Sequence, residues 1–125
     1  MKTIHNLKLR FLLLASMPLL RRAERKSRRF QQMLRDQPFV LQIQSRDGAA
    51  GYFELTEGRL QLHFGRYPHP SFSQTWATSK DAVRVMMSHD ESDLMRALED
   101  GSCEFDGSFL VAMWFNEAMK VARSL

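Results

Sequence analysis

The chain has 125 residues, of which 44% are hydrophobic, so it predicts one domain with a sizeable buried core. Its one cysteine, Cys103, excludes an internal disulfide and a metal site built from several thiolates. The net charge of +4 is uneven, because residues 1–36 hold ten of the 18 Lys and Arg residues and only two of the 14 acidic ones. The basic residues thus form one arm and leave the body without a basic groove, which argues against nucleic-acid binding.

The first twenty residues imitate a secretory signal, because Lys2, Lys8 and Arg10 precede an apolar run at 11–20. No small-x-small cleavage site follows this run. A helix of ten residues also spans only about 15 Å, whereas the hydrocarbon core of a bilayer is about 30 Å thick. We therefore expect neither a cleaved leader nor a membrane-spanning helix.

A second helix is predicted to begin at Pro18 and to end near Arg35, before Gln37 and Pro38. One face of this helix is apolar and consists of Leu20, Ala23, Ser27, Phe30 and Leu34. The opposite face is basic and consists of Arg21, Arg22, Arg25, Lys26, Arg28, Arg29 and Arg35. Two interpretations remain open: the arginines are solvated while the apolar face packs on the domain, or the arm binds anionic lipid or an acidic partner. The second interpretation assigns binding to Arg21, Arg22, Arg25, Arg28 and Arg29.

Four short runs between residues 39 and 78 alternate apolar and polar side chains, which is typical of half-buried strands. The apolar residues of these runs are Phe39, Leu41, Ile43, Phe53, Leu55, Leu60, Leu62, Phe64, Phe72 and Trp76. Turn sequences at 47–48 and 57–58 separate the first three runs, and Pro68 and Pro70 interrupt the chain before the fourth. These short links predict an antiparallel meander with one covered face.

Two helices are predicted after the strands. Ser79 is the expected cap of the first, Asp90 or Ser92 is the expected cap of the second, and Gly101 is expected to end it. A fifth strand at 103–105 is predicted to end at Gly107. The final helix then begins with an apolar run at 109–115 that needs cover on every side. The sheet covers one side, and the arm, a partner or a ligand is expected to cover the other.

The sequence lacks a catalytic or metal-binding pattern. Its histidines are scattered without the spacing of metal ligands, and it has no nucleophile elbow, phosphate loop or dinucleotide fingerprint. Cys103 is placed on a predicted buried strand, so we expect an inert thiol. The acidic stretch at 90–93 is interpreted as helix capping rather than as a cation site. We therefore expect no catalysis, no cofactor and no metal.

The order of strands, two helices, a short strand and an apolar final helix resembles the sterol carrier protein type-two (SCP-2) family. The resemblance covers about residues 39–120, and its most specific part is the glycine–strand–glycine–helix sequence that follows Leu94. The segments 72–76 and 79–87 are similar to the family's strand and following helix. The chain departs from the family at its N-terminus, where the basic arm replaces the expected opening helix. The resemblance implies lipid binding in a tunnel between sheet and helices. A narrower similarity, to bacterial accessory proteins of ubiquinone biosynthesis, implies a polyprenylated ligand that is held for partner enzymes.

We therefore predict an α+β fold, in which a five-stranded, mainly antiparallel sheet is covered on one face by helices. Residues 1–36 form a basic helical arm and residues 37–125 form the SCP-2-like domain. Methionine and aromatic side chains suit the walls of an apolar cavity, because methionine adapts its shape and aromatic rings supply contact area. The predicted ligand-binding residues are Phe72, Trp76, Met86, Met87, Leu94, Met95, Leu98, Phe109, Leu110, Met113 and Trp114.

The predicted function is that of a non-catalytic carrier for a lipid or an isoprenoid quinone precursor. The alternative is an interaction module of a membrane-associated biosynthetic complex, which contacts a partner enzyme or a second copy of the chain. Both functions fit a cytoplasmic protein that is peripheral at the inner face of the membrane.

Overall fold

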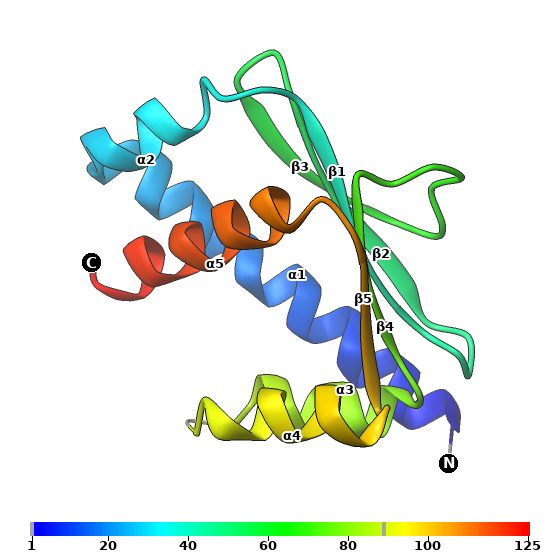
Figure 1. The fold of residues 1–125 in the computed structure, drawn as a ribbon. Helices are drawn as coiled ribbons and strands as arrows, with labels where there is room; N and C mark the ends of the chain where they lie inside the picture. Colours follow the sequence, from blue (N-terminus) through cyan, green and yellow to red (C-terminus); the bar gives the residue numbers. More distant parts are fainter. Residues whose placement is uncertain (1, 89) are drawn as a thin grey trace.

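The computed structural model describes residues 2–88 and 90–125 and contains a five-stranded sheet with helices on one face (Figure 1). The strands are β1 (Phe39–Ser45), β2 (Ala50–Thr56), β3 (Arg59–Phe64), β4 (Phe72–Trp76) and β5 (Cys103–Gly107). Their order across the sheet is β3-β2-β1-β4-β5. Three of the four strand pairs are antiparallel, so the predicted α+β class and mainly antiparallel sheet are confirmed.

The predicted meander is wrong at its fourth strand, because β4 pairs in parallel with β1. Residues 65–71 carry the chain across the outer face of the sheet, away from the helices (Figure 1). There the Tyr67 amide donates a hydrogen bond to Gln42 Oε1 at 2.6 Å, and the Tyr67 ring packs edge-to-face on Tyr52. A segment of this length with prolines at 68 and 70 does not make a tight hairpin. The chain therefore reaches the side of β1 opposite to β2 before it forms β4.

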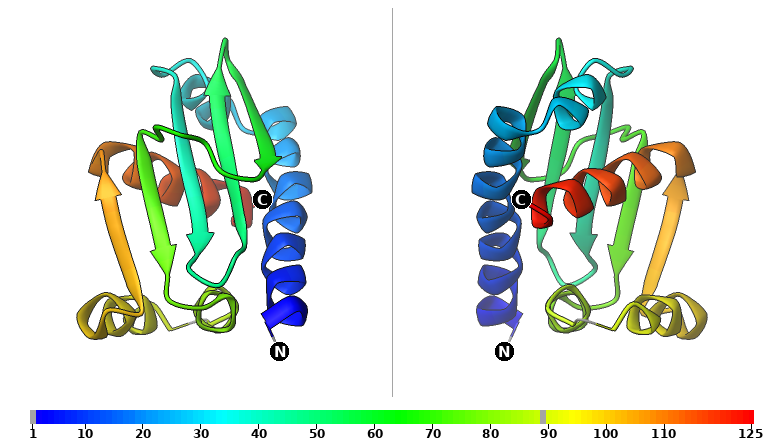
Figure 2. Two further views of the ribbon diagram at one scale, coloured as in Figure 1. Left: turned by 90° about the vertical axis from the view of Figure 1, so that its right-hand side faces the viewer. Right: turned by 90° about the vertical axis from the view of Figure 1, so that its left-hand side faces the viewer.

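The helix-covered face of the sheet carries the core. Five of its side chains from the central strands are at most 5% exposed, namely Leu41, Ile43, Phe53, Phe72 and Trp76. Helix α5 (Phe109–Arg123) crosses this face, and α1 (Lys2–Lys26) runs along the edge formed by β3 (Figure 2). Helices α3 (Ser79–Met86) and α4 (Ser92–Asp100) lie at one end of the sheet.

The first helix is longer than the sequence predicts, because α1 continues through Pro18 instead of ending before it. Pro18 is exposed, so water can bond to the Leu14 carbonyl that loses its helical partner. The helix is interrupted at Ser27, whose Oγ accepts a hydrogen bond from the Phe30 amide at 3.1 Å. This cap begins the short helix α2 (Arg28–Met33), so the predicted helix from Pro18 to Arg35 is wrong.

The inner face of α1 is part of the core. Leu9, Leu13, Leu20 and Ala23 are buried against the sheet edge, α3 and α5. The approach to β2 is close, because a Cβ atom at Gly51 would lie 2.9 Å from Leu13 Cδ1. A side chain at this position would require the Leu13 side chain to shift.

The cap of α3 also differs from the prediction. Thr78 is the N-cap, and its hydroxyl accepts a hydrogen bond from the Asp81 amide at 3.1 Å. Ser79 is instead fully buried, because its side chain turns toward the β1–β2 turn. The sequence does not distinguish the two candidates, because Thr78 and Ser79 are adjacent and both are residue types preferred at the N-cap.

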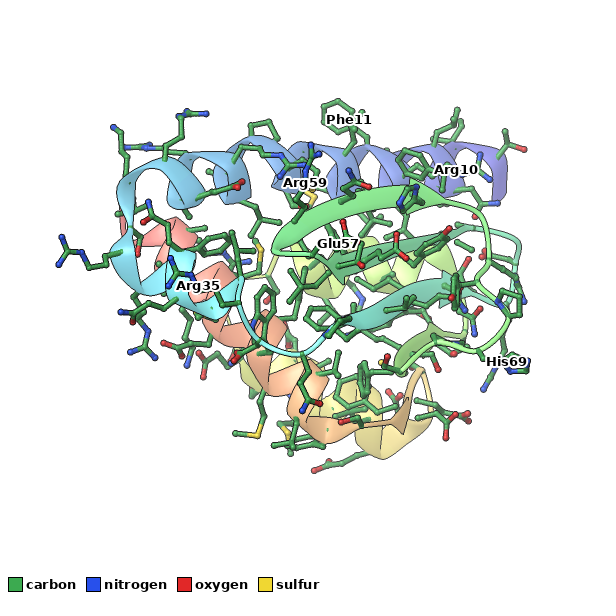
Figure 3. The ribbon with its side chains drawn as sticks, turned by 90° about the horizontal axis from the view of Figure 1, so that it is seen from above. Arg10, Phe11, Arg35, Glu57, Arg59 and His69 are labelled. Carbon is green, nitrogen blue, oxygen red and sulfur yellow. The ribbon has the colours of Figure 1, made fainter. Side chains whose placement is uncertain are left out.

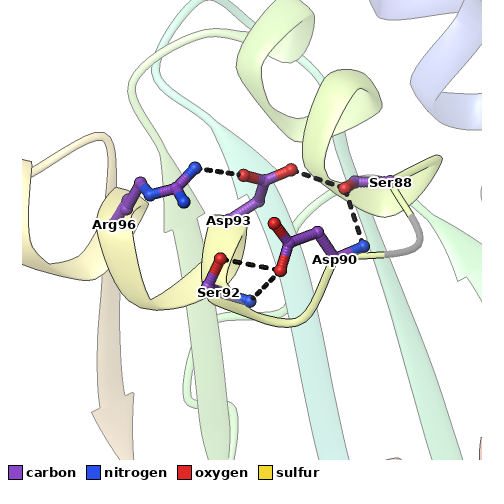
Figure 4. A network of polar contacts seen from close by, with 5 residues as sticks. All are labelled: Ser88, Asp90, Ser92, Asp93 and Arg96. Carbon is purple, nitrogen blue, oxygen red and sulfur yellow. Dashed lines mark hydrogen bonds and ion pairs between the residues drawn. The ribbon is translucent and has the colours of Figure 1, made fainter.

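The N-cap of α4 is Glu91, which makes no side-chain cap hydrogen bond, so the predicted cap at Asp90 or Ser92 is wrong. Polar side chains on both sides of Glu91 bond to one another instead (Figure 4). Asp90 Oδ1 accepts hydrogen bonds from the Ser92 amide at 2.9 Å and from the Ser92 hydroxyl at 2.7 Å. Asp93 pairs with Arg96 at 2.9 Å and accepts a hydrogen bond from Ser88. The hydrogen bonds from Ser92 lower the pKa of Asp90. Gly101 ends α4 in the left-handed conformation, which confirms the predicted stop.

A polar cluster formed by Asn6, Ser45, Asp47 and Ser79 joins three segments that are distant in sequence. Ser79 Oγ lies 2.5 Å from Asn6 Oδ1, 2.8 Å from Ser45 Oγ and 3.2 Å from Asp47 Oδ1. The Ser79 amide also donates to Asp47 Oδ1 at 3.0 Å, and Asn6 Nδ2 donates to the Asp47 carbonyl at 3.1 Å. The cluster fixes the first turns of α1 and α3 to the β1–β2 turn.

We expect Asp47 to make the stability of the fold depend on pH. Burial acts to raise the pKa of Asp47, but hydrogen bonds from Ser45 and Ser79 outweigh it and hold the pKa below its ordinary value. A carboxyl group of this kind stabilises the fold above its unfolded-state pKa of about 4, and that contribution is lost as the pH falls through the lower folded-state pKa. Asp47→Asn should therefore reduce the free energy of unfolding at pH 7 and have a smaller effect at low pH. Denaturant melts between about pH 2 and pH 7 measure the pH dependence of this penalty, with Asp36→Asn as an exposed control. A penalty for Asp47→Asn that stays constant with pH would contradict the assignment.

Candidate ligand-binding site

A cavity of about 280 Å³ lies between α1, the covered face of the sheet, α3 and α5. The sheet contributes Ile43 and Phe53, and α3 contributes Met86. The remaining walls come from the two long helices. They consist of Leu12, Leu13, Ala15, Ser16 and Leu19 of α1, and of Phe115, Met119 and Arg123 of α5.

The chemistry of these walls suits an apolar ligand. The hydroxyl of Ser16 donates to the Leu13 carbonyl at 2.6 Å, so its proton is already engaged within α1. Arg123 is the one charged residue among the lining side chains. It belongs to the last turn of α5 and is exposed, and it makes no ion pair within residues 2–88 and 90–125. An apolar chain with an anionic end therefore matches the lining.

The structure distributes the eleven predicted ligand-binding residues over several environments instead of gathering them around one cavity. Met86 lines the cavity described above. Leu110 and Trp114 line a second hollow of about 410 Å³, beside residues 36–39 and Ser71. The Trp114 indole donates to the Met33 carbonyl at 3.0 Å, which fastens α2 to α5.

The other predicted residues belong to the core or to the surface. Phe72 and Trp76 are buried, with the Phe72 ring edge-on to Phe105 and the Trp76 indole donating to Gln74 Oε1 at 2.7 Å. Leu94 and Leu98 are half-buried against the core. Four further side chains are more than half exposed, namely Met87, Met95, Phe109 and Met113.

Sequence reasoning missed most of the observed cavity wall. The sequence hides the contribution of α1, because the apolar run at 11–20 imitates a secretory signal and Pro18 has the pattern of a helix start. A continuous helix through this run has the spacing that reveals its inner residues, since Leu9, Leu13 and Leu20 share one face. Phe115 and Met119 are one turn apart on α5 and follow the residues that the sequence pattern selected.

The predicted binding arginines lie on α1 and α2 and differ in their contacts. Arg21 pairs with Glu24 at 3.2 Å, and Arg29 pairs with Glu117 of α5 at 3.0 Å. The other three are exposed and form no ion pair with the residues that the structure describes; they are Arg22, Arg25 and Arg28.

Cys103 is 1% exposed on β5, as expected of a core residue. Burial, together with the charge of Glu104, raises the pKa of its thiol to about 12, so the reactive thiolate is scarce at neutral pH. Across residues 2–88 and 90–125, no three His, Cys, Asp or Glu side chains are grouped so that they could hold a metal ion. None of the helices in these ranges is long and apolar enough to cross a bilayer.

The fold is similar to that of sterol carrier protein 2 domains of known structure. The solved structure of UbiJ-SCP2, a ubiquinone synthesis protein, matches with a TM-score of 0.62 and 14% sequence identity, over 91% of this chain and 93% of its own. The sterol carrier protein domain 2 of Helicoverpa armigera matches with a TM-score of 0.56 and 17% identity, over 87% and 85% of the two chains. No protein-family model and no curated protein sequence matches the chain. At these identities the similarity shows a shared fold.

Proposed function

We propose that this protein is a non-catalytic carrier that holds a hydrophobic ligand in the cavity between α1, the sheet, α3 and α5. The observation that carries this proposal is the lining itself, which is apolar except for Ser16 and Arg123. The fold supports it, because similar structures include a sterol carrier protein domain. An adaptable wall is available, since Met86 and Met119 line the cavity from two helices that are distant in sequence.

The size of the cavity favours one apolar chain. Its volume of about 280 Å³ is close to the lower end of ligand pockets, which run from roughly 300 to 1,000 Å³. It is also larger than the cavity of about 150 Å³ that binds benzene in an engineered core. An acyl chain or a short isoprenoid segment fits this space, and Arg123 favours a ligand whose polar end is anionic. The likeness to UbiJ-SCP2 supports an isoprenoid precursor of ubiquinone as one such ligand.

Displacement of a fluorescent probe tests the proposal. The neutral fluorophore N-phenyl-1-naphthylamine should brighten on binding, and laurate should displace it about tenfold more effectively than dodecanol, because only laurate pairs with Arg123. Arg123→Gln should remove this preference while Lys120→Gln, an exposed change on the same helix, preserves it. Native mass spectrometry and solvent extraction of the purified protein then identify the ligand class. A protein that binds neither the probe nor any extracted lipid would overturn the carrier function.

A second candidate function is that of an interaction module in a membrane-associated complex. The observation that favours it is the start of α5, where Phe109, Leu110 and Met113 are between 55% and 76% exposed. Large exposed apolar side chains of this kind are suited to contact with a partner enzyme or a second copy. Arg22, Arg25 and Arg28 are the free members of the predicted arginine set, and they supply a proposed contact for an anionic membrane or an acidic partner. A peripheral position at the cytoplasmic side of the inner membrane fits both candidate functions.

A further inference from the structure

Helix α1 has a second apolar face that points away from the protein. Ile4, Leu7, Phe11 and Leu14 are spaced three and four residues apart, and their exposed fractions are 49%, 57%, 67% and 53%. We call these four residues the outer stripe. In Figure 3 the side chain of Phe11 projects from α1 away from the sheet. Four large apolar side chains in one line on an exposed helix need an explanation other than the core, which the opposite face of α1 already serves.

The charges beside the outer stripe are positive. Lys8 and Arg10 flank it, and Arg22 and Arg25 continue the same side of the helix beyond Pro18. The acidic residue of α1 is Glu24, and it is engaged with Arg21 at 3.2 Å. The outer surface of α1 thus combines apolar side chains with cations that form no ion pair within residues 2–88 and 90–125. This is the composition of helices that lie in the interface of an anionic membrane.

We propose that the outer stripe docks this protein on an anionic lipid bilayer, with α1 lying in the plane of the interface and Phe11 inserted among the lipids. The spacing of the stripe would also suit a coiled coil between two copies. Charge argues against that occupant, because pairing two α1 helices would bring two strongly basic segments together. A bilayer that contains acidic lipids instead offers the opposite charge to both halves of the helix.

The docked orientation has a consequence for the ligand, which rests on the carrier function proposed above. Leu12, Ala15 and Leu19 of α1 line the cavity, and they lie about a quarter of a turn around the helix from the outer stripe. Leu19 is 38% exposed, so the cavity wall reaches the protein surface there. A bilayer in contact with the outer stripe would therefore lie beside the mouth of the cavity, and an apolar ligand could pass between them with a short exposure to water.

Vesicle binding by the full chain tests the docking surface. We expect the protein to bind vesicles of phosphatidylcholine with about 30% phosphatidylglycerol at least tenfold more tightly than vesicles of phosphatidylcholine alone. Combining Leu7→Gln with Phe11→Gln should weaken binding to the anionic vesicles about tenfold or more. Both positions are exposed, so the melting temperature should stay close to that of the unmodified protein.

The matched control is Leu110→Gln, because Leu110 is 76% exposed but belongs to the start of α5, on the β5 side of the sheet away from α1. It should leave vesicle binding unchanged. Insertion of the side chain at position 11 into the bilayer is measured separately, by tryptophan fluorescence. The fluorescence of Phe11→Trp should shift to the blue when anionic vesicles are added, whereas that of Leu110→Trp should not.

Each contrary result has a defined meaning. Equal vesicle binding by the protein and the Leu7 and Phe11 double variant would overturn the proposal and assign any binding to the arginines alone. A dimer in sedimentation that Phe11→Gln dissociates, without vesicle binding, would overturn it in favour of a second copy. In both cases displacement of N-phenyl-1-naphthylamine by laurate would still report on the cavity. Vesicle binding by a protein that does not bind the fluorophore would instead overturn the carrier function and leave the docking surface in place.

Discussion

Replacing Ala15 with Trp is expected to abolish ligand binding while the protein stays folded. Ala15 lines the cavity from α1, and its small side chain leaves space that an indole would occupy. The position is otherwise exposed, so the indole does not have to displace the buried residues of the inner face. We expect the affinity for N-phenyl-1-naphthylamine to fall by more than about tenfold, because the bound ligand would lose its place among the apolar walls. Fluorescence titration measures the affinity, and circular dichroism checks the fold.

The neighbouring residue provides the control for this change. Leu14 belongs to the outer stripe and does not line the cavity, so Leu14→Trp adds the same indole to α1 on the other side. It should leave the affinity for the fluorophore unchanged. If Ala15→Trp and Leu14→Trp bind the fluorophore equally well, the ligand does not occupy this cavity.

Replacing Gly107 with Ala is expected to cause the largest loss of stability from a single methyl group. A Cβ atom at this position would lie 2.3 Å from the Ser71 carbonyl oxygen and 3.0 Å from the Phe72 Cα, and both are backbone atoms that cannot turn aside. Gly107 also has a φ of +103°, which L-residues rarely adopt. The change would push the end of β5 away from β4 and disturb the start of α5. We expect the free energy of unfolding to fall by about 3 kcal/mol or more in a denaturant melt.

Two other glycines show how much of the expected loss of stability at Gly107 comes from steric overlap and how much comes from its positive φ. Gly65 and Gly101 also have positive φ values, of +103° and +83°, but a Cβ atom at either position would meet no atom within 4 Å. Gly65→Ala and Gly101→Ala should therefore cost only about 1 kcal/mol each. A similar loss at all three positions would show that contact between β5 and β4 is not what Gly107 protects.

Local patterns predicted the elements of this fold well. The alternation in 39–64 predicted three strands, because Leu41, Ile43, Phe53, Leu55 and Leu60 all face the covered side of the sheet. Gly101 and Gly107 marked the ends of α4 and β5, since both have the positive φ that favours glycine. These features depend on residues that are close in sequence, and short-range periodicity and turn chemistry describe them.

Features that depend on distant contacts were not predictable in this way. Pro18 is an ordinary helix start by local rules, but burial of Leu13 on one side of it and Leu20 on the other favours a continuous helix. No residue pattern within β1 or β4 indicates that these two strands pair in parallel. The candidate cavity posed the same difficulty, because the rotation of α5 decides that Phe115 and Met119 face inward while Met113 faces outward.

The cavity wall has a consequence for the way the protein is made. Its lining begins at Leu12 on α1 and ends at Arg123 on α5. A chain that emerges from the ribosome N-terminus first therefore exposes the apolar inner face of α1 long before its partners on α5 exist. The walls are complete once α5 has been synthesised. A nascent chain that stops short of α5 would expose the apolar inner face of α1 to water. It would also lack the cavity walls that Phe115, Met119 and Arg123 contribute.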